Sequence, residues 1–131
     1  IATTSENVED VGKAVAWLGN EDIAISGDAY IYTHEQNPKF IAYLFQTERF
    51  LAFKKMNVSG TKVTRISGDS LAKYPIPIPP LELQEKIVAI LDRFETLVND
   101  LTNGLPAEIA AVKDQYEYYR NKLLTFKKLS A

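Results

Sequence analysis

The sequence predicts an α+β protein in which a small mixed domain is followed by a long helical segment. Three observations support this class. The first third contains short β-prone runs separated by turn residues. A proline-rich strap follows at residues 75–80, and beyond it the apolar residues recur at helical spacing as far as Phe126. We therefore divide the chain into a mixed domain, residues 1–80, and a helical region, residues 81–131.

The composition places the chain among soluble globular proteins. It has 131 residues, of which 46% are hydrophobic and 24% charged. No run of about 18 apolar residues is present, so no membrane-spanning helix is predicted. The sequence contains no cysteine, which excludes disulfides, thiolate zinc sites and cysteine nucleophiles and fits a cytoplasmic protein. Because it begins at Ile1 without a signal pattern, we expect it to be cut from a longer chain.

The first third predicts a loop followed by strands. Residues 1–13 have no clear apolar period and are expected to form a loop. The runs 15–18, 23–26 and 29–33 are rich in β-branched and aromatic residues, and Gly-Asn and Gly-Asp pairs separate them, as in a meander or hairpins. We expect Trp17 to lie in the core rather than to serve as a ligand platform.

A helix is predicted next, with Asn37 as its N-cap and Pro38 as its first residue. Aromatic and aliphatic residues then recur at helical spacing, and we expect this helix to pack against the strands and to end at residues 57–60. The alternation in 61–66 predicts a half-exposed strand with a bulge or an early end. A turn at 67–70, capped by Asp69 or Ser70, would begin a short helix over 71–74.

The strap and the segment after it predict an extended helical region. Prolines cannot donate backbone hydrogen bonds, so residues 75–80 should form a stiff, extended exit from the mixed domain. Between residues 87 and 101 the apolar residues share one helix face. After residue 106 they alternate steps of three and four, the pattern of a coiled-coil seam that expects a partner helix opposite it. The predicted helix-pairing residues are Ile109, Val112, Tyr116, Tyr119, Leu123 and Phe126.

The residues between Gly104 and Pro106 interrupt this pattern. A proline inside a helix removes a hydrogen bond and costs about 3 kcal/mol. Either the helix kinks here, or Pro106 starts a second helix after Gly104 ends the first. We favour the kink, because both flanking patterns are long. A continuous helix of about 45 residues would span roughly 65–70 Å, too long for a core helix in so small a chain.

No pattern in the sequence indicates catalysis. His34 is the single histidine, so a histidine metal cluster is excluded, and we expect His34 to be an exposed or satisfied loop residue. No phosphate-binding glycine loop or dinucleotide fingerprint is present. Pro79-Pro80 lacks the preceding Asp or Asn and the following aromatic residue of the amino-methyltransferase motif. We therefore predict no catalytic residues, no metal and no cofactor.

The charge is uneven along the chain. The net charge is −2, and residues 1–48 are strongly acidic, whereas residues 49–73 hold six basic residues against the single acid Asp69. Cationic, hydroxyl and glycine residues at a helix–loop–strand junction suit contact with DNA phosphates, although an ordinary solvated turn would have the same composition. The candidate DNA-binding residues are Lys54, Lys55, Ser59, Gly60, Thr61, Lys62 and Arg65.

Five strings in this sequence are distinctive. They are Ser59-Gly-Thr61, Ile76-Pro-Ile-Pro-Pro-Leu-Glu-Leu-Gln84, Ile87-Val-Ala-Ile-Leu-Asp-Arg-Phe94, Gly104-Leu-Pro-Ala-Glu-Ile109 and Gln115-Tyr-Glu-Tyr-Tyr-Arg-Asn-Lys-Leu-Leu-Thr-Phe126. Together they resemble the specificity subunit of type I restriction–modification enzymes. The similarity is specific across the helical region, where the strings occur in the expected order, and looser over residues 14–74.

The resemblance implies a non-catalytic DNA-recognition protein. A specificity subunit of this family has two target recognition domains, each followed by a spacer helix, and the two helices pair antiparallel. Each domain reads one half of a bipartite site in double-stranded DNA. Methyltransferase (modification) subunits dock on this frame, and restriction subunits add cleavage.

The resemblance also suggests which part of such a subunit this chain supplies. Residues 1–80 would be the last part of one recognition domain, because a complete domain is longer, and residues 81–131 would be its spacer. The spacer would pair with a second recognition-domain and spacer copy, either in the same natural chain or in a homodimer.

Two alternatives remain. One is a small α/β interaction module that dimerises through its C-terminal helix without binding DNA, which the net charge of −2 and the acidic first third favour. The other is a fragment of an enzyme whose active site lies upstream.

Overall fold

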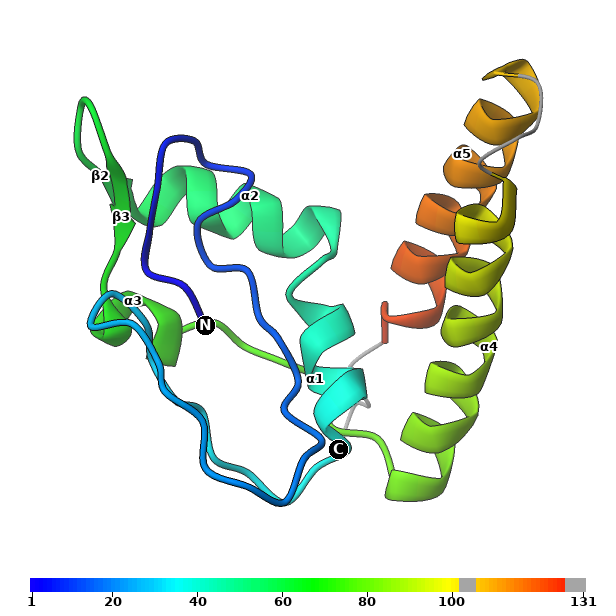
Figure 1. Ribbon diagram of the computed structural model, residues 1–131, viewed down its shortest axis with the longest axis horizontal. Coiled ribbons are helices and arrows are strands. Elements are labelled where there is room, and N and C mark those ends of the chain that lie inside the picture. The colour runs from blue at the N-terminus through cyan, green and yellow to red at the C-terminus, as the bar shows by residue number, and fades with distance from the viewer. Residues whose placement is uncertain (102–105, 127–131) are drawn as a thin grey trace. The chain divides into compact units, whose positions relative to one another are not determined.

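The computed structural model describes residues 1–101 and 106–126, and it divides into two compact units, Ile1–Ile76 and Pro77–Ala131 (Figure 1). The division falls inside the proline strap. Over the described ranges, no helix combines the length and the apolar character needed to cross a membrane.

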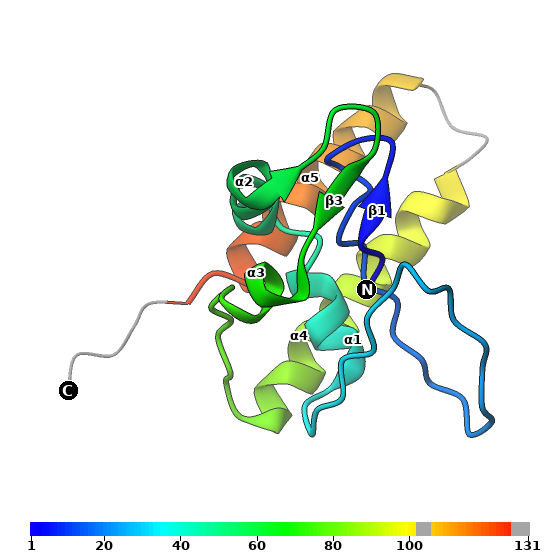
Figure 2. The ribbon, with the colours of Figure 1, turned by 90° about the vertical axis from the view of Figure 1, so that its left-hand side faces the viewer.

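A small antiparallel sheet lies in the N-terminal unit (Figure 2). Its strands are β1 (Thr4–Ser5), β2 (Val58–Ser59) and β3 (Thr64–Ile66), and β3 is the central strand. The prediction that residues 1–13 form only a loop is therefore wrong at β1. A strand of two residues has no readable pattern of its own, and β1 exists because the distant β3 pairs with it. The strand predicted over 61–66 starts late rather than ending early, since only its last three residues form β3 and it reaches the predicted end at Ile66.

The three β-prone runs between residues 15 and 33 do not form the predicted strands. Their single ladder contact is an isolated bridge between Ala2 and Ala29. Many of their side chains are exposed, with Val15 at 88% and Trp17 at 53%, so the prediction of a core position for Trp17 is also wrong. The indole N–H of Trp17 donates to the backbone oxygen of Glu21 at 3.2 Å. A β-prone run becomes a strand only where a neighbouring backbone pairs with its N–H and C=O groups. Among the described residues, the bridge at Ala29 is the one place where such pairing occurs along these runs.

Two helices replace the single helix predicted after Asn37. Helix α1 (Pro38–Leu44) begins as predicted, because the Asn37 side chain accepts a hydrogen bond from the Phe40 amide at 3.1 Å. Helix α2 (Glu48–Asn57) has Thr47 as its N-cap. The Thr47 hydroxyl donates to the backbone oxygen of Leu44 at 2.9 Å and accepts from the Phe50 amide at 3.3 Å. This hydroxyl therefore ends one helix and starts the next, a role that the uninterrupted apolar pattern concealed.

Aromatic side chains from these helices form much of the core of the N-terminal unit, although the strands over 15–33 against which a single helix was predicted to pack do not form. Phe40 and Phe50 are fully buried. The Phe50 ring lies 4.7 Å from Phe45 in an edge-on arrangement and 4.9 Å from Tyr74, distances typical of favourable aromatic pairs. Burial raises the pKa of Tyr74.

A short helix, α3 (Gly68–Ala72), precedes Tyr74 and brings it to this cluster. Its N-cap is Ser67, whose hydroxyl accepts from the Ser70 amide at 3.1 Å. The prediction of Asp69 or Ser70 as the cap is therefore wrong by two or three positions, and the helix starts correspondingly earlier than residue 71.

The C-terminal unit is a pair of helices, α4 (Leu81–Asp100) and α5 (Pro106–Leu123), that pack on one another. The Phe94 ring of α4 lies 5.5 Å from Tyr119 and 6.3 Å from Tyr116, both in stacked geometry. The favoured prediction of one kinked helix is wrong. Pro106 is instead the first residue of a second helix, where its missing N–H costs no hydrogen bond. Gly104 lies outside the described residues.

A buried glutamine joins the strap to α4. Gln84 is 0% exposed, and its side-chain nitrogen donates to the backbone oxygen of Pro79 at 2.8 Å. The amides of Leu83 and Gln84 both donate to the oxygen of Pro80, which begins the helix without a side-chain cap. The first turn of α4 thus receives its stabilising contacts from the strap itself.

The helix opposite the α5 seam is α4 of the same chain. All six predicted helix-pairing residues are partly exposed, so the contact with α4 leaves some of their surface uncovered: Ile109, Val112, Tyr116, Tyr119, Leu123 and Phe126. Leu124, which the predicted seam omits, is 4% exposed. Pairing of α5 with a second copy stays a prediction.

Candidate nucleic-acid interface

The predicted DNA-binding residues lie around the hairpin formed by β2 and β3. Its turn depends on Gly60, whose φ of +108° is a conformation that L-residues with side chains rarely adopt. A Cβ atom added to Gly60 would lie 2.0 Å from the backbone oxygen of Val63. The turn therefore requires glycine, and it presents the exposed side chains of Ser59, Thr61 and Lys62 in a defined order.

Replacing Gly60 with alanine is expected to lower the free energy of unfolding by about 1–3 kcal/mol, because the new methyl group strains the backbone and collides with the Val63 carbonyl. Gly27 provides the matched control, since a Cβ there would meet nothing within 4 Å. Urea denaturation of the two variants measures the difference. Equal stability of Gly60→Ala and Gly27→Ala would contradict this account of the turn.

One row of side chains crosses the exposed face of the sheet. Thr4 pairs with Arg65 in β3, and Arg65 pairs with Ser59 on the other side. Residues directly opposite each other in a ladder share a face, so the three side chains stand in line. The next residue, Ile66, is 3% exposed and belongs to the opposite, core-facing side. Thr4, absent from the predicted site, joins it only through its pairing with β3.

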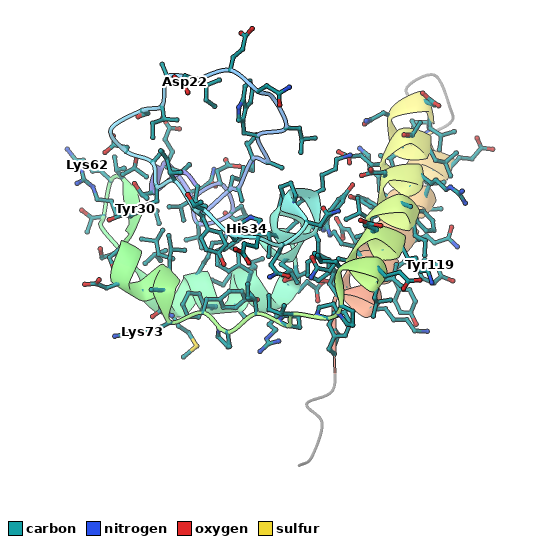
Figure 3. The ribbon with its side chains drawn as sticks, turned by 90° about the horizontal axis from the view of Figure 1, so that it is seen from below. Asp22, Tyr30, His34, Lys62, Lys73 and Tyr119 are labelled. Atoms are coloured by element: carbon teal, nitrogen blue, oxygen red, sulfur yellow. The ribbon has the colours of Figure 1, made fainter. Side chains whose placement is uncertain are left out.

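Three cationic side chains around the hairpin have no partner within the described part of the chain: Lys55, Lys62 and Arg65. Lys55 lies in the last turn of α2, immediately before β2. Lys62 extends outward from the turn between β2 and β3 (Figure 3). All three are exposed, and within the part of the chain that the structure describes no carboxylate pairs with them, so they are accessible to an anionic partner.

Lys54 does not belong to this exposed group, contrary to the prediction. It is 4% exposed, and its ammonium group donates to the backbone oxygens of Glu9 and Val11, each at 2.8 Å. The ammonium also lies 5.4 Å from the centre of the Phe50 ring. Burial lowers the pKa of Lys54, and the carboxylates of Glu9 and Asp10 oppose that effect. Lys54 therefore fastens the N-terminal loop to α2 and is not available to a phosphate.

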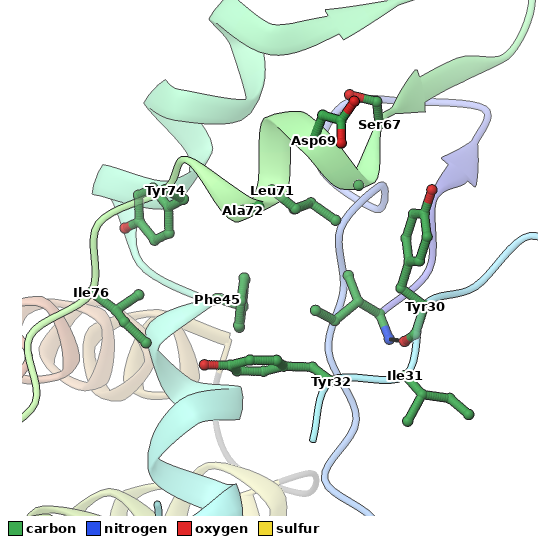
Figure 4. A pocket seen from close by; sticks show the side chains of 12 residues that line it. Tyr30, Ile31, Tyr32, Phe45, Ser67, Asp69, Leu71, Ala72, Tyr74 and Ile76 are labelled. Carbon is green, nitrogen blue, oxygen red and sulfur yellow. Dashed lines mark hydrogen bonds between the residues drawn. The ribbon is translucent and has the colours of Figure 1, made fainter. Parts of the chain in front are cut away.

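An aromatic cavity of about 770 Å³ opens elsewhere in the N-terminal unit (Figure 4). Tyr30, Tyr32, Phe45 and Tyr74 contribute aromatic walls, and Asp69 adds a carboxylate at the start of α3. None of these residues was predicted to bind a ligand. They come from three separated parts of the sequence, and no spacing pattern links them.

The described residues contain no group of three or more His, Cys, Asp or Glu side chains placed to hold a metal ion. His34 accepts a hydrogen bond at Nδ1 from the Gln36 amide at 3.1 Å, and its ring lies 4.9 Å from Tyr32. The prediction of a satisfied loop histidine is confirmed.

Comparison with known proteins relates the chain to one family. Residues 15–111 match the model of the type I restriction modification DNA specificity domain. The chain is 51% identical over 117 residues to the type I restriction enzyme specificity subunit S.HindORF215P of Haemophilus influenzae, covering 88% of this chain and 30% of that protein.

Two other relatives carry similar names. The EcoR124I/EcoR124II specificity subunit of Escherichia coli is 38% identical over 90 residues, which are 69% of this chain and 22% of that protein. The MpnII specificity subunit of Mycoplasma pneumoniae is 40% identical over 88 residues, covering 67% of this chain and 26% of that protein. The chain thus spans less than a third of the length of each of these relatives. No solved structure matches it.

Proposed function

Since the chain belongs to the type I restriction modification DNA specificity family, we propose that it is the part of a specificity subunit that recognises one half of a bipartite DNA target. The observation that carries this proposal is the group of unpartnered cations around the β2–β3 hairpin: Lys55, Lys62 and Arg65. Exposed cations beside hydroxyl groups and a fixed glycine turn suit a phosphate backbone. The overall net charge of −2 does not oppose this, because a local positive surface governs the approach of DNA.

The proposal assigns different tasks to the two units. The N-terminal unit is the end of a target recognition domain and contacts double-stranded DNA. The helices α4 and α5 form the spacer, which holds the recognition domain at a set distance from a second recognition-domain and spacer copy. Methyltransferase subunits dock on the spacer, restriction subunits complete the assembly, and this chain supplies no catalytic group.

A protein-interaction module without DNA binding is the second candidate. The specific observation in its favour is the set of apolar side chains exposed between residues 15 and 32, of which Val15 at 88% and Ile31 at 74% are the most accessible. An apolar surface of this kind is typical of protein–protein contacts. The first candidate predicts that the chain binds DNA and that the affinity depends on Lys55, Lys62 and Arg65. The second predicts that the chain does not bind DNA.

The salt dependence of DNA binding tests the proposal. Replacing Lys55, Lys62 and Arg65 together with alanine should reduce the slope of log K against log salt concentration by about 2.7. The reason is that each phosphate contact releases counterions from the DNA and contributes about 0.9 to the slope, so losing three contacts removes three such contributions. Fluorescence anisotropy with a labelled duplex of arbitrary sequence, measured over a salt series, gives this slope. If Arg65 contacts a base instead, the reduction falls to about 1.8 for the two lysines.

A control variant with the same charge change separates local contacts from net charge. Lys73, Arg93 and Lys113 are exposed and lie away from the hairpin in sequence. Replacing these three with alanine should leave the slope within about 0.5 of that of the unsubstituted chain. This margin is smaller than the change of about 0.9 that the loss of one phosphate contact would cause. Equal slopes for the two triple variants would remove the hairpin from the DNA interface, and no measurable DNA binding would favour the interaction module.

A further inference from the structure

The three unpartnered cations lie at different places in the hairpin and in the helix before it, and this difference separates their roles. We propose that Arg65 reads a base in the major groove, through two hydrogen bonds to a guanine, whereas Lys62 and Lys55 contact phosphates. This inference rests on the proposed DNA-binding function and adds to it the identity of a specificity-determining residue.

The backbone of Arg65 is held on both sides by the sheet. It lies in β3, which has a paired strand on each side. The following residue, Ile66, is buried, and its amide donates to the backbone oxygen of Thr3 at 3.0 Å. The backbone on either side of the Arg65 side chain is therefore fixed by the ladder and by the core. A base contact needs this precision, because two hydrogen bonds must align at once.

The neighbours of Arg65 leave its side chain free to extend from the sheet. Its cross-strand partners are Thr4 and Ser59, two short side chains with hydroxyl groups. Neither is acidic, and Arg65 forms no ion pair or hydrogen bond with any residue described in the structure. A hydroxyl can donate a hydrogen bond to, or accept one from, any base edge, so Thr4 and Ser59 would tolerate different bases. Arg65, which lies between them, would be the residue of this row that selects a particular base.

The dimensions of the hairpin suit the major groove. β3 has a neighbouring strand about 4.8 Å away on each side, so the two outer backbones lie about 10 Å apart, within a groove about 12 Å wide. The planar guanidinium presents parallel N–H groups, which match the O6 and N7 acceptors on the guanine edge. Arg65 is the only one of the three cations that combines this fork with a position on the face of the sheet.

The lysines are placed for a different contact. Lys62 lies in the turn beyond both strands, and Lys55 lies in α2 before β2. Each carries a compact charge on a flexible stem and can follow a phosphate of any sequence. The two lysines would thus set the position of the sheet on the duplex, while the arginine discriminates between bases.

Selection from a pool of duplexes with a randomised 16-base-pair centre tests the assignment. We expect the unsubstituted chain to enrich sequences with guanine at one position. The variant Arg65→Gln should lose that preference by about 5- to 150-fold and shift it toward adenine, which glutamine contacts through N6 and N7. The variant Lys62→Gln should weaken binding to every duplex by a similar factor and leave the enriched sequence unchanged.

A change in the DNA supplies a test that needs no protein variant. Replacing the enriched guanine with 7-deazaguanine removes the N7 acceptor and should weaken binding by the unsubstituted chain but not by Arg65→Gln. An unchanged enriched sequence in Arg65→Gln, or DNA binding without any enrichment, would overturn the role of Arg65 alone. Absence of DNA binding by the unsubstituted chain would overturn the proposed function as well.

Discussion

Replacing Lys54 with alanine is expected to lower the free energy of unfolding by about 2–4 kcal/mol, because it leaves two backbone oxygens, of Glu9 and Val11, without their hydrogen-bond donor. The variant also removes the aliphatic stem that packs near Gly12 and Phe50. Urea denaturation followed by circular dichroism measures the loss. The N-terminal loop, which Lys54 fastens to α2, should show the earliest rise in amide hydrogen exchange.

The adjacent Lys55 is the natural control. It is exposed and has no partner in the described parts of the chain, so Lys55→Ala should change the unfolding free energy by no more than about 0.5 kcal/mol. In DNA binding the order reverses. Lys55→Ala should reduce the salt slope by about 0.9, whereas folded Lys54→Ala should retain it. A reduced salt slope with undiminished stability in Lys54→Ala would show that Lys54 faces the DNA after all.

Replacing Tyr119 with glutamate is expected to separate α5 from α4. The Tyr119 ring stacks on Phe94 with 5.5 Å between centroids. The substitution removes this ring contact and places a charged carboxylate in a partly desolvated position, and both effects disfavour the pairing of α5 with α4. An isolated helix of 18 residues is marginally stable in water, so α5 should lose much of its helicity once it is detached. The expected result is a weaker circular dichroism signal at 222 nm and fast amide exchange throughout α5.

The neighbouring Tyr118 supplies the control, because it is 57% exposed and has Lys122 5.7 Å from its ring. Tyr118→Glu should keep the helical signal. Sedimentation equilibrium of the unsubstituted chain and both variants then distinguishes the partner of the α5 seam. If Tyr119→Glu dissociates a dimer while α5 stays helical and protected, the seam contacts a second copy rather than α4, and the hairpin of α4 and α5 is not the state in solution.

The sequence alone determined those features that local backbone chemistry controls. The start of α1 follows from the Asn37 cap and Pro38, and the end of α2 from the residues after Asn57. The extended strap follows from its prolines, and α4 from the apolar stripe beyond it. The family was also readable, because the distinctive strings of the helical region occur in order, and the family model matches residues 15–111.

The candidate site was only partly readable. The cluster of basic residues at 49–73 indicated the region, and the glycine turn at Gly60 was recognisable as part of it. Composition could not separate Lys54, whose ammonium is buried, from Lys55, which is exposed one position later. Nor could composition place Thr4 beside Arg65, because the two residues are far apart in sequence and only the pairing of β1 with β3 brings them together.

Tertiary structure decided which of these local tendencies acquired partners. The β-prone runs between residues 15 and 33 remained without a ladder, whereas the short β1, with no pattern of its own, became a strand because β3 lies beside it. In the same way, the seam of α5 packs on α4, and Lys54 donates hydrogen bonds to two backbone oxygens. Caps and periodicity act within a few residues, but ladders, seams and buried hydrogen bonds require groups that are distant in sequence, and only folding brings those groups together.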